Sequence, residues 1–411
     1  MQLTIHRGSH QIGGSCVELS TQNTTILIDL GSPLDETTSK PININFKNKA
    51  IDAVLISHPH QDHYGQISLL PPAVPVYIGN LSKPVLDAIA TFTNHPHPQN
   101  AFRFFERGKP FVVGDLTITP FLVDHSANDA YCFLIEAEGK TLVYSGDFRD
   151  NGYKGFLLED VIKKLKGKSV DVLIMEGTSL EREPAEFPQE KDVAKEIERI
   201  ITKQSNASFL VASSTNFDRM ISASLACDKA GKILVVDIYT AWIMELMKTI
   251  SKKEPLLDRP HVKVLANGKY AKKQYVKIQG DPHYQSFCRK IYAKPNNITL
   301  EEIKATPEKC LIKMSEWVID KMTEEITTAE TPVQIIYSMW KYPSYERLKI
   351  LKNTTFHYAH TSGHATLEVL KKYAHALSPK KLIPIHTETP SLFKEHFQNV
   401  VEVEDGKTIE I

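Results

Sequence analysis

Residues 57–65 read Ser-His-Pro-His-Gln-Asp-His-Tyr-Gly, and they directly follow the apolar run Ala53–Ile56. A strand that ends in so short a turn brings its side chains to one point, and imidazole and carboxylate are ligands that zinc-type ions prefer. Four ligands are too many for one ion that keeps an open position. The spacing therefore predicts two ions, the usual device for activating water; the alternative is a polar, His-rich surface loop. The four ligand-type residues are His58, His60, Asp62 and His63.

Ligand-type residues also stand just past the ends of later apolar runs. His125 and Asp147 follow the predicted strands Leu116–Val123 and Thr141–Tyr144, and His386 follows a third near the end of the chain. Strands are rigid and the loops after them are free to carry chemistry. We therefore expect a hydroxide activated by two metals as the nucleophile. The predicted ligands are His58, His60 and His125 for one ion, Asp62, His63 and His386 for the second, and Asp147 as the bridge between them.

The order of these motifs resembles the metallo-β-lactamase fold of binuclear hydrolases, and further motifs narrow the resemblance. Val170–Met175 reads as a strand that leads into Glu176, which is similar to acidic motif A of the β-CASP nucleases. The segments 360–365, His-Thr-Ser-Gly-His-Ala, and 383–386, Ile-Pro-Ile-His, are similar to motifs B and C in the form seen in RNase J-type ribonucleases. The resemblance covers essentially the whole chain, as a short form that lacks the C-terminal domain of RNase J.

The resemblance implies an α/β fold of two domains. A metallo-β-lactamase αββα sandwich would span residues 1–190 and 351–411, and an inserted α/β β-CASP domain would span 191–350. From about Lys191 strands alternate with helices, which is typical of a largely parallel sheet. The chain would return to the first domain at Thr354–Ala359, and the cleft between the domains would take an extended substrate.

The resemblance also implies a function. The chain would be a metal-dependent ribonuclease that hydrolyses RNA phosphodiester bonds, with zinc as the expected metal and manganese or iron as alternatives. Glu176 would orient His364, the general acid that protonates the leaving oxygen. Free N–H groups of a helix over Ala365–Leu377 would favour a phosphate there. Asp29 is expected to support the ligand turn. The predicted catalytic residues are Asp62, Glu176 and His364.

Two polar segments are candidates for contact with substrate phosphates. One precedes the general acid, and the other lies in the inserted domain and resembles the phosphate-contacting turn of RNase J-type enzymes. Serine and asparagine are also ordinary helix N-caps, so the second segment has a plain alternative. The candidate residues are His360, Thr361 and Ser362 in the first segment, and Ser213, Ser214, Asn216 and Arg219 in the second.

Charge is distributed unevenly along the 411 residues, although Lys plus Arg and Asp plus Glu number 49 each. Residues 197–350 hold 24 basic and 17 acidic residues, and the rest of the chain holds 25 and 32. Within residues 261–277, lysines alternate with Tyr270 and Tyr275, which suits a single-stranded polyanion. A solvated helix face is the alternative. The lysines are Lys263, Lys269, Lys272, Lys273 and Lys277.

The expected partner is single-stranded RNA, with DNA and a homodimer left open. No apolar run of about 18 residues and no signal peptide is visible, so we expect no membrane partner and a cytoplasmic location. The five cysteines lack C-x-x-C spacing, and most of them are predicted to be core thiols. Trp340 could stack on a base or belong to the core. The alternative functions are a DNA-processing β-CASP nuclease, a small-molecule metallo-hydrolase and an idle nucleic-acid-binding protein.

Overall fold

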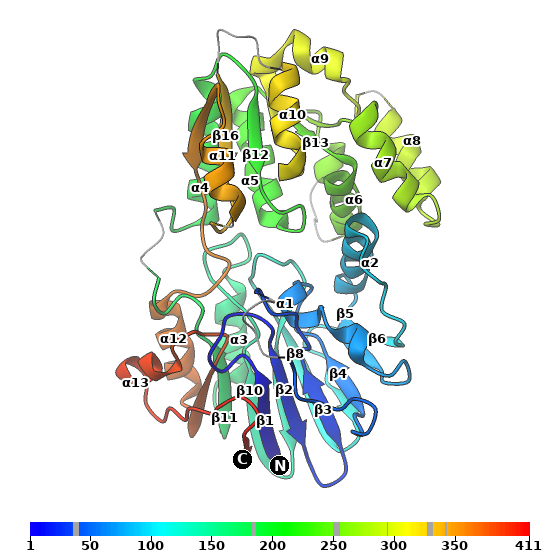
Figure 1. The fold of residues 1–411 in the computed structure, drawn as a ribbon. Coiled ribbons are helices and arrows are strands. Elements are labelled where there is room, and N and C mark those ends of the chain that lie inside the picture. The colour runs from blue at the N-terminus through cyan, green and yellow to red at the C-terminus, as the bar shows by residue number, and fades with distance from the viewer. Residues whose placement is uncertain (36–40, 183–185, 250–254, 294, 327–331, 342) are drawn as a thin grey trace. The chain divides into compact units, whose positions relative to one another are not determined.

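The computed structural model describes residues 1–35, 41–182, 186–249, 255–293, 295–326, 332–341 and 343–411. The chain divides into two compact units (Figure 1), and each is described by itself. The first unit comprises Met1–Leu86, Pro96–Pro184 and Gly363–Ile411, and the second comprises Asp87–His95 and Ala185–Ser362.

The first unit contains two sheets. The seven-stranded sheet has the order β19-β1-β2-β3-β4-β5-β6, and the six-stranded sheet has the order β18-β11-β10-β9-β8-β7. Strands of the first sheet are β1 (Gln2–Arg7), β2 (Cys16–Ser20), β3 (Thr25–Ile28), β4 (Ala53–Leu55), β5 (Val76–Gly79), β6 (Phe102–Phe105) and β19 (Thr408–Glu410). Those of the second are β7 (Phe111–Val113), β8 (Leu116–Val123), β9 (Ala130–Ala137), β10 (Lys140–Tyr144), β11 (Val172–Glu176) and β18 (Lys381–Ile385).

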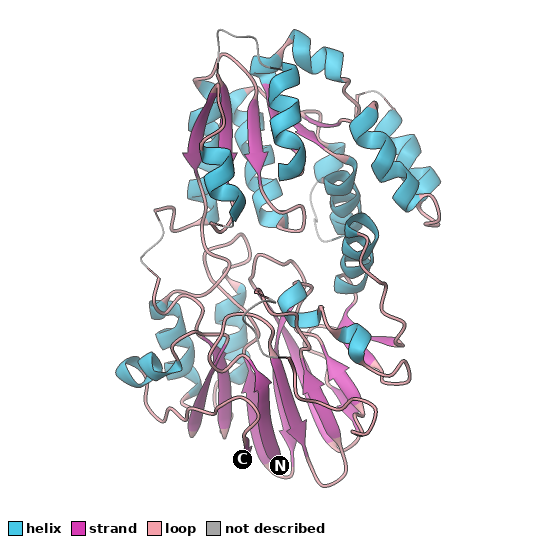
Figure 2. Cartoon of the chain, in the orientation of Figure 1, coloured by secondary structure: helices cyan, strands magenta, loops and turns pink. Residues whose placement is uncertain are grey.

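The two sheets of the first unit pack face to face. Leu3 and Val17 of the first sheet share one buried cluster with Phe133 and Leu142 of the second. Helices cover the outer face of the second sheet (Figure 2), because their apolar residues repeat at helical spacing and bury one side. This arrangement confirms the predicted α/β class and the sandwich of sheets. The helices of this unit are α1 (Gln61–Tyr64), α2 (Ser82–Thr93, which the division of the chain cuts), α3 (Leu157–Leu165), α12 (Leu367–Leu377) and α13 (Phe393–His396).

The second unit contains one six-stranded sheet of order β14-β13-β15-β12-β16-β17, in which every neighbouring pair is parallel. Its strands are β12 (Ser208–Val211), β13 (Ile233–Val236), β14 (Val262–Val264), β15 (Cys310–Lys313), β16 (Val333–Tyr337) and β17 (Thr354–Tyr358). Its helices are α4 (Glu190–Thr202), α5 (Phe217–Ala230), α6 (Ile238–Leu246), α7 (Lys269–Ile278), α8 (Tyr284–Tyr292), α9 (Leu300–Ala305), α10 (Glu316–Ile326) and α11 (Pro343–Lys349). The predicted largely parallel sheet is confirmed.

The limits of the second unit differ from the predicted 191–350. β17 pairs with β16 along its whole length, so the segment 354–358 belongs to the parallel sheet of the second unit and not to the returning piece of the first. Half-buried strands look alike in sequence, and only the pairing partner decides which sheet a strand joins. The segment Asp87–His95, which includes the end of α2, also falls in the second unit.

The helix expected from Ala365 begins two residues later. α12 starts at Leu367, and Thr366 is its N-cap, with a side chain that accepts from the Val369 backbone N–H. The Ala365 N–H instead lies 3.4 Å from a carboxylate oxygen of Glu176. The predicted start of the helix is therefore two residues too early, because the Thr366 hydroxyl caps the helix. Binding of a phosphate near this terminus stays a prediction.

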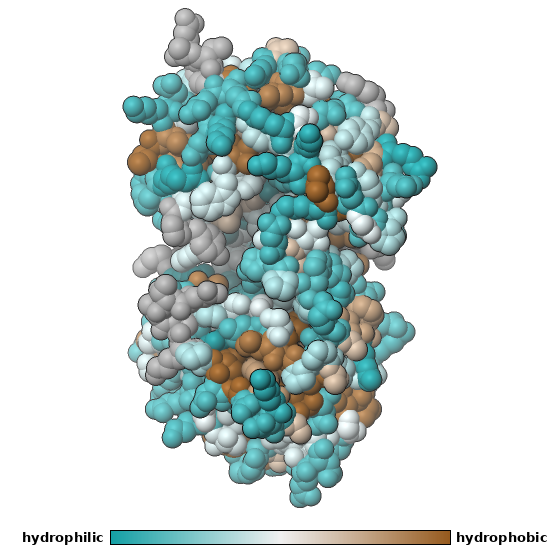
Figure 3. Space-filling model, turned by 45° about the vertical axis from the view of Figure 1, so that its right-hand side comes forward, coloured by the Kyte–Doolittle hydropathy of each residue, from teal (hydrophilic) through white to brown (hydrophobic). Residues whose placement is uncertain are grey.

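The surface and the thiols follow ordinary patterns. All five cysteines are free, and four are buried core thiols, as predicted for most of them, whereas Cys288 is partly exposed. No helix among the described residues has the length and apolar character that a membrane crossing requires. Hydrophilic side chains cover most of the face in Figure 3. Large apolar side chains that are exposed in the second unit include Trp317, Trp340 and Ile350.

Candidate metal centre

The turn after β4 holds four candidate ligands in a small space. α1 follows β4 after five residues, and His60 is its N-cap. The turn lies tightly against the neighbouring loop, since a Cβ on Gly31 would stand 1.7 Å from the Asp62 carbonyl oxygen. Only glycine permits so close an approach of two backbones. Local sequence thus fixes the position of the turn, and the fold brings the remaining ligands to it.

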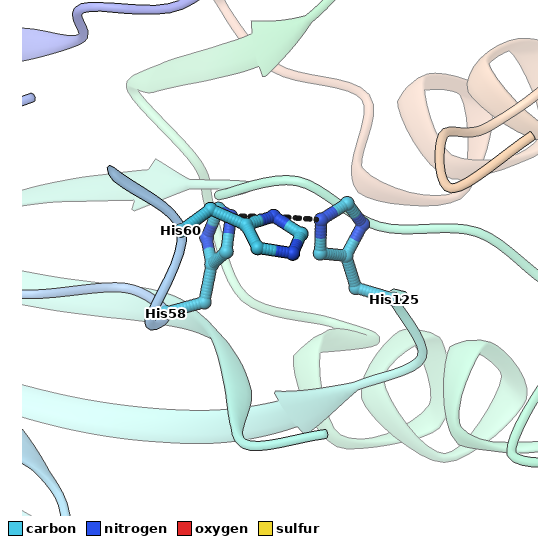
Figure 4. Close-up of side chains that lie close together, drawn as sticks. All are labelled: His58, His60 and His125. Atoms are coloured by element: carbon cyan, nitrogen blue, oxygen red, sulfur yellow. Dashed lines mark hydrogen bonds between the residues drawn. The ribbon is translucent and has the colours of Figure 1, made fainter. Parts of the chain in front are cut away.

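Three histidines form a first cluster of ring nitrogens (Figure 4). His58 Nε2 lies 3.1 Å from His60 Nδ1, and His125 Nε2 lies 3.0 Å from the same nitrogen. His125 comes from the loop after β8, as its position past a strand end predicted. The candidate ligand atoms of this cluster all lie within 4.8 Å of one another.

A second cluster consists of Asp62, His63 and His386. Asp62 Oδ2 lies 3.2 Å from His386 Nε2 and 3.7 Å from His63 Nε2. Asp147 Oδ2 lies 3.2 Å from His63 Nε2 and 3.8 Å from the Nε2 atoms of His58 and His386. This carboxylate thus stands beside rings of both clusters, where a bridging ligand would stand. The structure brings together all seven predicted ligands.

Asp29 fixes the rings of the ligand turn. One of its carboxylate oxygens lies 2.7 Å from His63 Nδ1 and accepts from the Tyr144 hydroxyl at 2.7 Å, and the other accepts from the Ser57 N–H at 2.7 Å. The Ser57 hydroxyl also donates to Asp29, so it accepts from His58 Nδ1, which lies 3.0 Å away. Both rings therefore turn Nε2 toward the centre. This is the supporting role expected for Asp29.

Two other ligand rings are held in the same way. His125 Nδ1 donates to the Gly363 carbonyl at 2.5 Å, and His386 Nδ1 lies 2.6 Å from the Thr178 hydroxyl. His386 and Asp29 also have positive φ angles, 54° and 59°, which non-glycine residues rarely adopt. Such strained positions gather where the surrounding structure holds a functional side chain in place.

The donor set fits a pair of divalent ions. His63 Nε2 is buried and makes no hydrogen bond of good geometry within the described residues, although Asp147 Oδ2 lies 3.2 Å away. An unpaired buried nitrogen is costly unless something binds it. Two ligand atoms at this separation are spaced as neighbours around one ion would be. Imidazole and carboxylate together suit zinc, manganese and iron.

Burial keeps the first cluster neutral. Burial, aided by the imidazole of His63, lowers the pKa of His60 to about 4, although the charge of Asp62 opposes this. Burial likewise holds the pKa values of His58 and His125 well below the usual range, and nearby imidazoles add to the effect. Neutral imidazole is the form that binds a metal. These rings therefore have their lone pairs available at neutral pH.

Carboxylates dominate the second cluster. Burial alone would lower the pKa of His63, but the carboxylates of Asp147 and Asp29 raise it well above the usual range. Burial alone would raise the pKa of Asp147, but the imidazoles of His386 and His63 hold it well below its usual range. Without an ion, protons on these rings balance the carboxylates, and an ion would replace the protons.

Glu176 and His364 form the predicted carboxylate–imidazole pair. Glu176 is the last residue of β11 and fully buried, and its Oε2 lies 3.1 Å from His364 Nδ1. Backbone N–H groups of Thr178 and Phe148 also donate to this carboxylate, at 3.2 and 3.3 Å. His364 Nδ1 is 3.7 Å from Asp147 Oδ2, and 18% of the side chain is exposed. The ring is therefore beside the ligand clusters and open to a substrate.

The polar side chains of the turn after β12 form hydrogen bonds with other groups of the protein. The exposed Ser213 hydroxyl lies 2.8 Å from that of Thr215, and Asn216 caps α5 by accepting from the Arg219 N–H at 3.1 Å. Ser214 is buried and accepts from the ammonium of Lys313 at 2.6 Å. Asn216 thus has the N-cap role that was the plain alternative. Contact of this turn with a substrate stays a prediction.

Arg219 requires a correction. Its side chain is fully buried, and its guanidinium donates to Glu190 Oε1 and to the Ser338 carbonyl, both at 2.6 Å. Nη1 also lies 3.5 Å from His360 Nδ1. The guanidinium has a carboxylate partner and no exposed surface for a phosphate. We therefore assign Arg219 to the support of the loop after β17 instead of to direct substrate contact.

The remaining predicted contacts lie in that loop. Thr361 is buried, and His360 and Ser362 are partly exposed. Their binding of a phosphate stays a prediction. Nothing in the local sequence marks two supporting residues, Tyr144 and Lys313, since each looks like an ordinary strand residue. Thr178 had a usable signal, because it stands just past the end of β11, where ligand-type residues stand after other strands.

Comparison with known families agrees with this geometry. A model described as a beta-lactamase superfamily domain matches residues 24–213, and one described as a Zn-dependent metallo-hydrolase RNA specificity domain matches residues 351–411. All seven candidate ligands and His364 lie within these two matches. Over residues 24–213 the chain is similar to the beta-lactamase superfamily. The predicted fold and the likeness to RNase J-type proteins are thus confirmed, and the activity of a metal-dependent hydrolase stays a prediction.

Individual relatives of this chain are distant in sequence. It is 22% identical over 367 residues to Ribonuclease J of Sinorhizobium meliloti, covering 84% of this chain and 59% of the relative. It is 26% identical over 255 residues to the RNase J-like protein of Methanocaldococcus jannaschii, covering 58% of each. For Ribonuclease J of Mycoplasma genitalium the identity is 24% over 399 residues, covering 93% and 67%. The chain thus spans about three fifths of the first two relatives.

A solved structure shares the fold over nearly the whole length. A protein of unknown function from Enterococcus faecalis aligns with a TM-score of 0.74 and 21% identity, covering 99% of both chains. At this identity the match shows the fold alone. The two-unit architecture therefore occurs in a protein of similar length.

Proposed function

We propose that this chain is a metal-dependent ribonuclease that hydrolyses phosphodiester bonds of single-stranded RNA. The observation that carries the proposal is the convergence of seven ligand-type side chains on one centre beside the Glu176–His364 pair. The RNA-specificity description of the segment 351–411 and the names of the relatives support RNA over DNA. A site for a small molecule alone would not need this pairing with an RNA-specificity segment.

Two divalent ions bound at the centre would supply Lewis acidity and a water that loses its proton near neutral pH. The three neutral rings of the first cluster suit one ion, and the carboxylate-rich second cluster suits the other. The proposed ligands are His58, His60 and His125 for the first ion, Asp62, His63 and His386 for the second, and Asp147 for both.

The chain's own proton donor would be His364. Its Nδ1 faces the buried carboxylate of Glu176, which can accept a hydrogen bond from it and so fixes the orientation of the ring. The ring's other nitrogen, Nε2, is then the atom that gives its proton to the leaving oxygen of the substrate. Asp62 would act beside it as a carboxylate of the second cluster, 3.2 Å from His386 Nε2. Glu176 is a positioning residue in this scheme.

The test is hydrolysis by metal-loaded protein of labelled single-stranded RNA, single-stranded DNA and a small phosphodiester. We expect two ions per chain by elemental analysis, cleavage of RNA, loss of cleavage on chelation and recovery with zinc or manganese. His60→Ala and His125→Ala should lose metal and activity. His95→Ala and His97→Ala, in a loop outside the metal-ligand groups, are the matched controls and should keep both.

The same assay separates the alternatives. Cleavage of DNA in preference to RNA would instead assign the chain to the DNA-processing nucleases. A metal-loaded protein that hydrolyses only the small phosphodiester would replace the ribonuclease proposal with a small-molecule hydrolase. A homodimer and a cytoplasmic location stay predictions.

A further inference from the structure

A cluster of aromatic rings lies at one edge of the second unit's sheet. β17 is the edge strand, and α11 precedes it in the chain. Tyr345 of α11 packs edge to face against Tyr358 and Phe356 of β17, with ring centres 5.8 and 5.2 Å apart. The rings of Tyr345, Phe356 and Tyr358 are only partly buried. We call these three residues, with Tyr337 beneath them and His360 beside them, the ring cluster.

Two lysines stand over the ring cluster. Lys341 Nζ lies 5.2 Å from the centre of the Tyr358 ring and 5.4 Å from that of Tyr345, and Lys349 Nζ lies 5.7 Å from the Tyr345 ring. Both lysines are exposed. Neither forms an ion pair with an acidic residue in the described part of the chain. Their positive charge is therefore not neutralised by the protein, and it lies beside flat aromatic surface.

The basic segment 261–277, identified from the sequence, differs from the ring cluster in how its lysines are paired. Lys269 is paired with Glu325, Lys277 donates to the Phe92 carbonyl, and Lys263 donates to the Pro295 carbonyl. The charge of Lys269 is offset by the protein itself, and the other two ammonium groups are held by carbonyls. Exposed Lys272 and Lys273 remain there without the aromatic neighbours that Lys341 has. The ring cluster thus combines ammonium groups that pair with no carboxylate of the described residues and aromatic rings that are partly exposed, the two features that suit a single-stranded nucleic acid.

We infer that the ring cluster with Lys341 and Lys349 binds single-stranded RNA, an inference that rests on the proposed ribonuclease function. Ammonium groups pair with phosphates, and partly exposed rings stack on bases. Trp340, which is 48% exposed and next to Lys341 in the chain, adds a further aromatic face. The chain continues from Tyr358 into the loop 360–362, so a strand bound here would lead to the predicted phosphate contacts.

Duplex RNA provides the internal comparison. Stacking on protein rings needs bases that are free of a helix, whereas phosphate pairing does not. The ring cluster should therefore discriminate single strands from duplexes. A surface that only attracts charge would bind both in proportion to their phosphates.

The experiment measures binding of labelled single-stranded and duplex RNA in the metal-loaded His364→Ala background, which limits turnover. For Lys341→Gln with Lys349→Gln we expect the Kd for the single strand to rise about tenfold. The slope of log affinity against log salt should flatten by about 1.4, since each phosphate contact on a single strand contributes about 0.7. Lys304→Gln with Lys321→Gln removes the same charge from exposed sites on α9 and α10, and should change neither value.

A second variant separates stacking from charge. Tyr358→Leu keeps an apolar side chain but removes the flat ring, so the Kd for the single strand should rise about tenfold with the salt slope unchanged. Binding of duplex RNA should change far less. Circular dichroism of each variant shows whether the fold is retained, and the lysine variants, at exposed positions, carry the test if Tyr358→Leu unfolds.

The outcomes are distinguishable from those of the proposed function. If the parent cleaves RNA while the double lysine variant binds like the Lys304/Lys321 control, the ring cluster is not an RNA surface. It would then fit a protein partner instead, and the ribonuclease proposal would stand. A parent that neither binds nor cleaves RNA overturns both proposals.

Discussion

The ligand turn at residues 57–65 and the turn Ser213–Asn216 have the same plan in sequence, a buried strand that ends in polar residues. In the first turn, Asp29 takes the Nδ1 atom of His63 and leaves Nε2 directed at a shared centre. In the second turn, other groups of the protein satisfy the polar side chains: Asn216 accepts from the Arg219 N–H, and Ser214 accepts from the ammonium of Lys313. The two turns therefore differ in whether a buried polar atom is left without a hydrogen bond in the described structure.

This difference teaches how to weigh a polar motif. His63 Nε2 is buried without a hydrogen bond in the described structure, and such an atom is costly unless it binds an ion. No polar atom of the turn Ser213–Asn216 is buried without a partner there. Polar residues after a strand are therefore weak evidence of a site by themselves. Convergence of several ligand-type side chains on one centre is stronger evidence, and substitutions in the two regions should behave differently.

The largest effect is expected at the general acid. His364→Ala should lower turnover of RNA about 10²–10⁴-fold, the usual contribution of a general acid, while two ions per chain remain bound. Steady-state kinetics and elemental analysis measure the two quantities. Glu176→Gln should act in the same direction, because the carboxylate that orients the His364 ring is lost. Loss of metal from His364→Ala would instead make His364 a ligand, as its grouping with Asp147 and His386 allows.

The next effect concerns stability in the second unit. Arg219→Met leaves the buried Glu190 carboxylate without its charge partner, and removal of one member of a buried pair costs about 3–5 kcal/mol. Chemical denaturation should show this loss, and Glu190→Leu added to Arg219→Met should recover part of it. If Arg219→Met is as stable as the parent but binds RNA more weakly, the original prediction of a phosphate contact is right and our correction is wrong.

A smaller effect is expected behind the ligand turn. Asp29→Asn keeps the size of the side chain but removes the charge beside His63, so metal affinity should fall about 10–100-fold. Competition with a chromophoric chelator measures it. Asp129→Asn is the matched control, because Asp129 is also buried and accepts from backbone, at the start of α2. That variant should lose stability and keep metal affinity; equal losses of affinity in both variants would refute a specific role for Asp29.

The sequence predicted the site residues whose positions depend on short motifs and on the ends of strands. All seven ligands, Glu176 and His364 lie at or just past strand ends or in one short motif, so their convergence followed once the strands were recognised. It could not predict that Glu190 pairs with Arg219, since nothing local links two residues 29 positions apart. Nor could it assign β17 to the second unit, because the alternation of a strand does not name its neighbour. Long-range pairing is the part that local patterns omit.

Lys313 gives the last and smallest prediction. Burial lowers the pKa of its ammonium, while the charge of Asp237 opposes this, and Nζ donates to Ser214 at 2.6 Å. In the unfolded chain the pKa returns to the ordinary value of 10.5. Between the two pKa values the unfolded state binds a proton that the folded state has lost, so stability rises with pH through that window, and the cost of the buried charge is fully present below it.

Lys313→Met removes this charge and its cost. We compare the unfolding free energy of the parent with that of Lys313→Met at neutral pH and at a pH just below the ordinary lysine pKa. The value of the parent relative to the variant should be about 1 kcal/mol higher at the higher pH. Denaturant titrations at the two pH values measure the difference, with Lys304→Met as an exposed control. A difference that does not change with pH would mean that Ser214 and Asp237 compensate the buried ammonium fully. The protein would then compensate the charge beside the turn Ser213–Asn216 as fully as it satisfies the hydrogen bonds of the turn. The ligand turn differs, because it keeps a buried nitrogen without a hydrogen bond in the described structure.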